Sequence, residues 1–159
     1  MERRRKHQSH RPSQNTYPRI TVYQRQKSVK ISPSSVRKAV LFFLHEKKIE
    51  CQELSVYFVS KQKITQLHGD FFQDPTPTDC ITFPLHDHFL GEVFICPEVA
   101  LEVRPQKTAE EITLYLLHCL LHLIGYDDID KRKRAKMRRE EKRLMTLARK
   151  NRCILEISL

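Results

Sequence analysis

The sequence lacks any Cys-x-x-Cys pair, although it contains five cysteines. An odd number of scattered cysteines argues against a disulfide framework, and the missing pairs argue against a zinc finger built on thiolates. We therefore expect the thiols to be reduced and to pack as small hydrophobic side chains, as in a cytosolic protein. They are Cys51, Cys80, Cys96, Cys119 and Cys153.

The sequence also lacks a hydrophobic run of membrane-spanning length. Its longest apolar stretch, residues 114–124, contains two histidines and is well short of the ~20 residues that a span requires. No apolar segment follows the basic N-terminus, so no secretory signal is expected. We therefore expect the protein to be soluble and to have no membrane partner. With 159 residues, 40% of them hydrophobic, and no internal repeat, it fits a single domain with one core.

Charge is distributed unevenly along the chain, whose formal net charge is +10. Residues 1–30 carry nine Lys or Arg against one Glu, and residues 131–152 carry twelve against two. The part between them is therefore acidic. An acidic middle between basic ends suits a cation site in the centre and ends that meet a polyanion. Basic ends that only increase solubility are the alternative.

Hydrophobic periodicity predicts an α+β domain, residues 20–159, after a basic flexible arm over residues 1–19. Ser32 followed by Pro33 starts a helix, and Thr108 with Glu111 forms a capping box for another. Gly125 ends that helix. The expected strands are residues 20–24, 54–58, 80–84 and 92–96, and the expected helices are 33–47, 61–68, 97–103, 108–124 and 130–150. Together they form a small sheet packed with several helices.

Two histidines on the apolar helix 108–124 predict a metal site at the end of this central helix. His118 and His122 are four residues apart, so both rings project from one face and can share a cation. After Gly125 the chain reverses and brings Asp127 and Asp128 back towards them. We favour Asp128 as third ligand, with Asp127 as the alternative. Three protein ligands and an open fourth position for water are typical of catalytic zinc.

Two other interpretations of this pattern remain. A helical histidine pair can simply be hydrogen-bonded without a metal. A metzincin-like zinc hydrolase shares the spacing, but its general base is a Glu directly after the first His. Here that position is Cys119, which disfavours the protease.

Three blocks of the sequence resemble the YbeY-type endoribonucleases, which mature bacterial ribosomal RNA. They stand in the family's order, and the resemblance spans about residues 54–128, which makes it specific. The blocks are His118-Cys119-Leu120-Leu121-His122-Leu123-Ile124-Gly125-Tyr126-Asp127-Asp128, Pro77-Thr78-Asp79-Cys80-Ile81-Thr82-Phe83-Pro84 and Gly91-Glu92-Val93-Phe94-Ile95.

The resemblance implies a single domain with a mixed four-stranded sheet, and a cytoplasmic zinc enzyme that hydrolyses single-stranded RNA, not DNA. It implies roles in 16S rRNA 3′ end maturation and ribosome quality control, with the small ribosomal subunit as partner. His118, His122 and Asp128 would hold one zinc ion per chain, and Glu92 and Asp127 are candidates to orient a ligand imidazole. A non-catalytic, ribosome-associated RNA-binding module with a structural metal is the alternative.

The sequence departs from the family pattern at three positions. Asp128 replaces the family's third His and admits other divalent ions more readily. Cys119 replaces a glycine. Phe72 stands where the family has an Arg, so no charge there can contact a phosphate.

Two further segments carry expectations. Loop residues His86, Asp87 and His88 could form a second cation site, although solvated loop residues are the favoured interpretation. In helix 130–150 we expect a core-facing stripe and an exposed basic face that meets ribosomal RNA. The stripe is Met137, Leu144 and Leu147, and the basic face includes Lys133, Lys136, Arg139 and Arg143.

Overall fold

The structure, a computed structural model, describes residues 17–85 and 89–159. Residues 1–16 of the predicted arm and the loop residues His86, Asp87 and His88 lie outside the described residues, so the expectations for both remain predictions. The first strand begins at Arg19, the last residue of the predicted arm and one residue before the predicted start of the strand. Within the described ranges no helix combines the length and the hydrophobicity needed to cross a bilayer.

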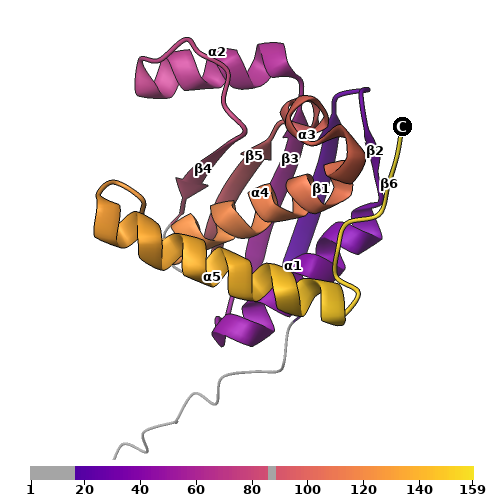
Figure 1. The fold of residues 1–159 in the computed structure, drawn as a ribbon, viewed down its shortest axis with the longest axis vertical. Helices are drawn as coiled ribbons and strands as arrows, with labels where there is room; N and C mark the ends of the chain where they lie inside the picture. The colour runs from indigo at the N-terminus through magenta and orange to yellow at the C-terminus, as the bar shows by residue number, and fades with distance from the viewer. Residues whose placement is uncertain (1–16, 86–88) are drawn as a thin grey trace, which may run out of the picture.

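A mixed four-stranded sheet forms the centre of the fold (Figure 1). Its spatial order is β1-β3-β5-β4, with β1, β3 and β5 parallel and β4 antiparallel to β5. The four-stranded sheet and the α+β class are thus confirmed. The strands are β1 (Arg19–Arg25), β3 (Glu53–Val59), β4 (Cys80–Pro84) and β5 (Phe89–Ile95).

Three helices cover one face of this sheet. α1 (Pro33–Lys47) packs on β1, and α4 (Thr108–Leu123) packs on β4 and β5. α5 (Lys131–Lys150) lies across α4 and α1, as Figure 1 shows. The side chains between these helices and the sheet form one continuous hydrophobic core. Burial of this apolar surface is the main force that stabilises the layers.

The remaining elements surround the sheet. α2 (Lys61–Phe72) follows β3 and packs beside β4, and α3 (Pro97–Val103) and the short 3-10 helix η1 (Pro105–Lys107) lead into α4. β2 (Lys30–Ile31) and β6 (Ile157–Ser158) pair antiparallel and tie the end of the chain to the start of α1.

Gly91 sets how closely α4 can approach the sheet. A Cβ at this position of β5 would lie 2.5 Å from the carbonyl oxygen of Phe83 and 2.8 Å from Leu123 of α4. Its φ of 151° is also a conformation that side chains with a Cβ rarely adopt. Only glycine lets the C-terminal end of α4, which carries His122, lie directly on β5.

Several predictions were wrong in detail. The capping box is not formed, because the Thr108 hydroxyl donates to the carbonyls of Arg104 and Pro105 and α4 has no side-chain N-cap. α2 continues past Gly69 to Phe72, since a helix tolerates a single glycine. Leu147 is only half-buried, and Met145 and Ala148 join Met137 and Leu144 on the buried stripe of α5 instead. The paired strands β2 and β6 were not predicted.

Candidate metal centre

His118 and His122 lie one turn apart near the C-terminal end of α4. The C-terminal half of this helix is apolar apart from these two histidines, and both stand on its partly exposed side while their neighbours Leu117, Cys119 and Leu121 are buried. Their side chains are 25% and 26% exposed. Packing therefore fixes the direction of both rings and leaves their outer nitrogens accessible.

The turn after α4 returns the chain to the histidines, as Gly125 predicts. Gly125 has a φ of 104°. Its N–H donates to the His122 carbonyl at 3.0 Å, and the Tyr126 N–H donates to the Leu121 carbonyl at 3.0 Å. These two bonds make a Schellman motif, which requires a left-handed residue at this position. The motif directs residues 126–128 back over the end of the helix.

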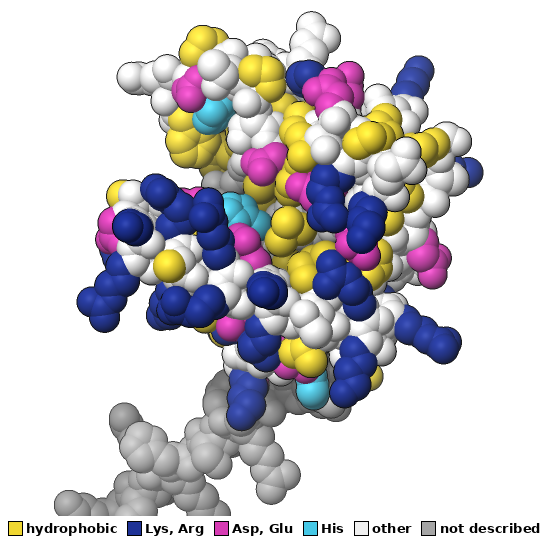
Figure 2. Space-filling view, viewed as in Figure 1, with side chains coloured by type: hydrophobic (Ala, Val, Ile, Leu, Met, Phe, Trp, Pro, Cys, Tyr) yellow, Lys and Arg dark blue, Asp and Glu magenta, His cyan; other side chains and the backbone are white. Residues whose placement is uncertain are grey.

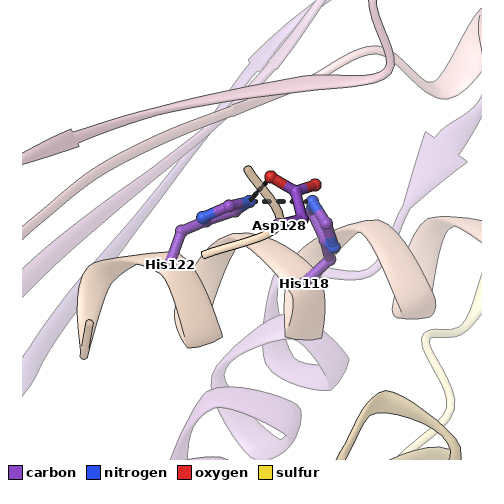
Figure 3. A group of neighbouring side chains, drawn as sticks. All are labelled: His118, His122 and Asp128. Atoms are coloured by element: carbon purple, nitrogen blue, oxygen red, sulfur yellow. Dashed lines mark hydrogen bonds and ion pairs between the residues drawn. The ribbon is translucent and has the colours of Figure 1, made fainter. Parts of the chain in front are cut away.

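The turn brings Asp128 to the two histidines (Figure 3). The Nε2 atoms of His118 and His122 are 3.0 Å apart, and His122 Nε2 is 3.9 Å from Asp128 Oδ1. All three ligand atoms lie within 4.8 Å of one another. The Asp128 side chain is 47% exposed, so the cluster opens to solvent on that side.

Each imidazole is held through its other nitrogen. His118 Nδ1 donates to a carboxylate oxygen of Glu141 on α5, and His122 Nδ1 donates to the Tyr126 carbonyl at 3.0 Å. Such bonds fix the tautomer, because a neutral ring protonated at Nδ1 presents a lone pair at Nε2. Carboxylate or carbonyl partners of this kind accompany most metal-binding histidines.

The three side chains fit a divalent cation. With both Nδ1 atoms donating, two Nε2 lone pairs face each other, which is favourable only if a cation or a proton lies between them. Zinc–nitrogen distances of about 2.0–2.1 Å in tetrahedral geometry place two imidazole nitrogens roughly 3.3 Å apart. The observed separation of 3.0 Å is close to that value. The cluster can therefore hold a metal ion.

The electrostatic surroundings of His118 also favour positive charge. Burial lowers the pKa of His118, but the hydrogen bond that the ring donates to Glu141 and the nearby carboxylates of Asp79 and Asp128 outweigh it, so the pKa is raised. The same carboxylates that stabilise an imidazolium also stabilise a bound cation. Protons and metal therefore compete for this ring.

The structure does not bring Glu92 and Asp127 to the imidazoles. Gly91 faces α4, so the next residue, Glu92, points to the opposite face of the sheet, where it lies beside Tyr57. The Asp127 carboxylate instead pairs with Lys133 at 3.3 Å. The imidazole partners are Glu141 and the Tyr126 carbonyl. The sequence pattern that could have indicated Glu141 is its place as an acidic residue on the buried stripe of α5, beside Met137, Leu144 and Ala148.

The cluster lies where two cavities meet, and together we call them the cleft. One cavity, of about 340 Å³, extends towards α5, and the other, of about 390 Å³, extends towards α2. Asp79, His118 and Asp128 line both. Phe72, 52% exposed, lines the α2 side beside His68 and Phe83.

The cysteine that replaces the family's glycine is buried. Cys119 is 0% exposed and lies against Cys80 of β4. A hydrogen bond with Cys119 and burial raise the pKa of Cys80 well above its ordinary value, so this thiol stays protonated. Cys119 therefore adds packing and leaves the histidines in place.

Comparison with known proteins agrees with this site. A family model described as "Endoribonuclease YbeY" matches residues 20–149. A protein named Endoribonuclease YbeY from Protochlamydia amoebophila is 38% identical over 140 residues, which cover 82% of this chain and 93% of the relative. One of the same name from Chlamydia abortus is 38% identical over 149 residues, covering 86% and 94%.

A solved structure has the same fold. The solution structure of TM1509 from Thermotoga maritima superposes with a TM-score of 0.56 at 23% sequence identity, covering 84% of this chain and 94% of that one. At this identity the likeness concerns the fold. The match to the family model and to the two relatives, over most of each chain, shows that this protein belongs to the YbeY endoribonuclease family.

Proposed function

We propose that this protein is a zinc-dependent endoribonuclease specific for single-stranded RNA, with His118, His122 and Asp128 as the metal ligands. We further propose that it acts in 16S rRNA 3′ end maturation and ribosome quality control in the bacterial cytoplasm. One observation supports the metal-dependent chemistry most directly: the Nε2 atoms of His118 and His122 face each other at 3.0 Å beside the exposed carboxylate of Asp128. The names of the relatives support RNA as substrate.

Each residue of the cluster has a separate task in this proposal. His118, His122 and Asp128 hold the cation, while Glu141 and the Tyr126 carbonyl keep both rings protonated at Nδ1. When bound, the cation supplies a Lewis acid that polarises a phosphate oxygen and acidifies water. The half-exposed Asp128 leaves an open side from which a phosphodiester can approach.

Zinc is the proposed ion because imidazole nitrogens suit it and the ligand count matches a catalytic site. The carboxylate of Asp128 is a harder ligand than the imidazole of the histidine that the family has at this position. Other divalent ions are therefore accepted more readily. Metal analysis of the purified protein identifies the ion.

Preference for single strands follows from the position of the cluster. The imidazoles lie where two cavities meet between α5 and α2, and the cleft is lined by acidic side chains that include Asp79 and Glu111. A flexible strand can bend one phosphate into this cleft. A stiff duplex cannot, and it would bring a second phosphate backbone towards these carboxylates.

Two other functions are less well supported. A metzincin-like protease needs a carboxylate next to the cation at position 119, where the buried Cys119 lies against Cys80. A non-catalytic ribosome-associated module would hold metal and bind RNA without cutting it.

The direct test is to incubate zinc-loaded protein with one RNA sequence offered as a single strand and as a duplex. We expect cleavage of the single strand, much slower cleavage of the duplex, loss of cleavage with a chelator and recovery on addition of zinc. Equal cutting of both forms would contradict the strand preference. Binding without cutting at high enzyme concentration would favour the non-catalytic module, and chelator-sensitive casein hydrolysis would favour the protease.

A further inference from the structure

α5 forms one wall of the cleft and carries most of the positive charge near it. Figure 2 shows Lys and Arg side chains gathered over this helix. Residues 134, 137, 138 and 141 line the cavity that also contains His118 and Asp128. Because these positions follow a helical period, α5 presents one continuous face to the metal cluster.

Two arginines supply the positive charge on that face. Within residues 17–85 and 89–159, Arg134 and Arg138 are the only Lys or Arg side chains that line either cavity of the cleft. They are one turn apart and both are exposed. Like charges at this spacing destabilise a helix, and a bound anion offsets that repulsion.

The acidic groups of the same cavity do not neutralise these arginines. Glu111 pairs with Arg104 at 3.2 Å, and Glu141 is bonded to His118. Arg134 donates from Nε to the backbone carbonyl of Asp128 at 3.3 Å, which leaves its terminal nitrogens available and holds the guanidinium beside the third ligand. No ion pair is formed by Arg138 among the described residues.

The opposite wall lacks such a charge. Phe72 and His68 of α2 and residues of β4 line it, and Phe72 stands where the resembling family has an Arg. An anion that spans the cleft therefore meets guanidinium groups only on the α5 side. A guanidinium offers a planar fork of donors that matches phosphate oxygens and is always charged.

We propose that Arg134 and Arg138 together bind one phosphate of the RNA strand, next to the phosphate held at the metal cluster. This inference rests on the proposed function, because it specifies how the substrate of that site is held. The two arginines position the strand across His118 and Asp128, while Phe72 on the α2 wall faces the sugar and base.

The test compares two double variants of equal charge. Arg134→Gln with Arg138→Gln removes the proposed phosphate contacts. The matched control, Arg132→Gln with Lys142→Gln, removes two exposed charges from the same helix that do not line the cleft. For each protein we would measure metal content, KM and kcat on a single-stranded oligonucleotide, and the affinity of the chelator-treated protein for that oligonucleotide at several salt concentrations.

We expect Arg134→Gln with Arg138→Gln to keep its metal and to raise KM and Kd about tenfold or more, the loss typical of hydrogen bonds to charged groups. The slope of log K against log salt concentration should become less steep by about 0.7, the value for one phosphate contact on a single strand. The control should change KM and Kd less than about twofold.

Equal effects of the two double variants would overturn the inference, because the arginines would then act only through net charge. If the wild-type protein cuts no RNA, the proposed function fails. The affinity measurement still decides whether these two arginines bind the strand, so the two failures can be told apart.

Discussion

Glu141 is the side chain that ties the candidate metal site to α5. It lies in the buried stripe of that helix, and its carboxylate bonds to His118 Nδ1. Across a sequence separation of 23 residues, it fixes the ring that would otherwise rotate at the edge of the cleft. A carboxylate in this place also makes Nε2 a stronger donor to a metal.

Replacing Glu141 should therefore weaken metal binding without removing a ligand. We expect Glu141→Gln to lower zinc affinity by about 10–100-fold, the range for groups that orient metal-binding histidines. Competition with a chromogenic chelator measures it. Glu110→Gln is a suitable control, because Glu110 also joins α4 to α5, through Arg149 at 3.1 Å, without contacting a histidine. Similar affinities of Glu141→Gln and the control would show that Glu141 does not orient the ring.

At the scale of single elements, the contact of α4 with β5 determines where the histidines stand. Gly91→Ala should destabilise the protein by about 1–3 kcal/mol, because its Cβ would meet a backbone carbonyl at 2.5 Å and Leu123 at 2.8 Å. Urea unfolding measures this. Gly69→Ala is the control, since its Cβ would lie 3.7 Å from Pro75 inside a helix, where alanine is favoured. A Gly91→Ala protein as stable as wild type would contradict the close approach.

A charged network joins α1, α5 and the turn after α4. Lys47 donates to the Tyr126 hydroxyl at 2.9 Å and to Glu140 at 3.0 Å, and Arg143 pairs with Glu140 at 2.6 Å. Hydrogen bonds from Arg143 and then Lys47, opposed by burial, lower the pKa of Glu140 from 4.5 to about 2. The network thus holds Tyr126, whose carbonyl fixes His122.

This pKa shift predicts a loss of stability in acid. A carboxyl whose pKa is lower in the folded state stabilises the protein above its unfolded pKa, and that stabilisation is lost as pH falls through the folded pKa. We expect the stability that Glu140 contributes relative to Glu140→Gln to disappear between about pH 4.5 and pH 2. Urea unfolding across that range measures the difference. A difference that stays constant over this range would contradict the shifted pKa.

The sequence predicts most elements and the three clustered side chains, since both depend on local patterns. Ser32 caps α1 and Gly125 reverses the chain after α4, and neither requires tertiary information. The sequence does not predict contacts between residues that are distant along the chain. Glu141 meets His118 only because α5 packs on α4, and the strand β5 turns Glu92 to the opposite face.

Two other errors have different causes. The hydroxyl of Thr108 bonds to carbonyls of the preceding 3-10 turn, so it cannot cap α4. The two-residue strands β2 and β6 are too short to show alternation, and they form because the C-terminal segment packs on the core through Leu155.

At the scale of the whole molecule, positive and negative charge are separated around the cleft. The chain has a net charge of +10, yet the carboxylates of Asp79 and Glu111 line the cleft together with His118 and Asp128, while basic side chains cover α5 (Figure 2). A cation is attracted to the carboxylates, and a polyanion is attracted to the helix beside it. This arrangement suits an enzyme that holds metal and RNA together.

The most direct test of the metal site compares the metal content and single-strand cleavage of His122→Ala with those of wild type and of His45→Ala. His45 is an exposed residue of α1 outside the cleft. Since two ligands do not hold a tetrahedral zinc ion, His122→Ala should lose both the metal and the cleavage. Wild type and His45→Ala should each retain about one ion per chain. Unchanged metal content and cleavage in His122→Ala would contradict the assignment of His118, His122 and Asp128.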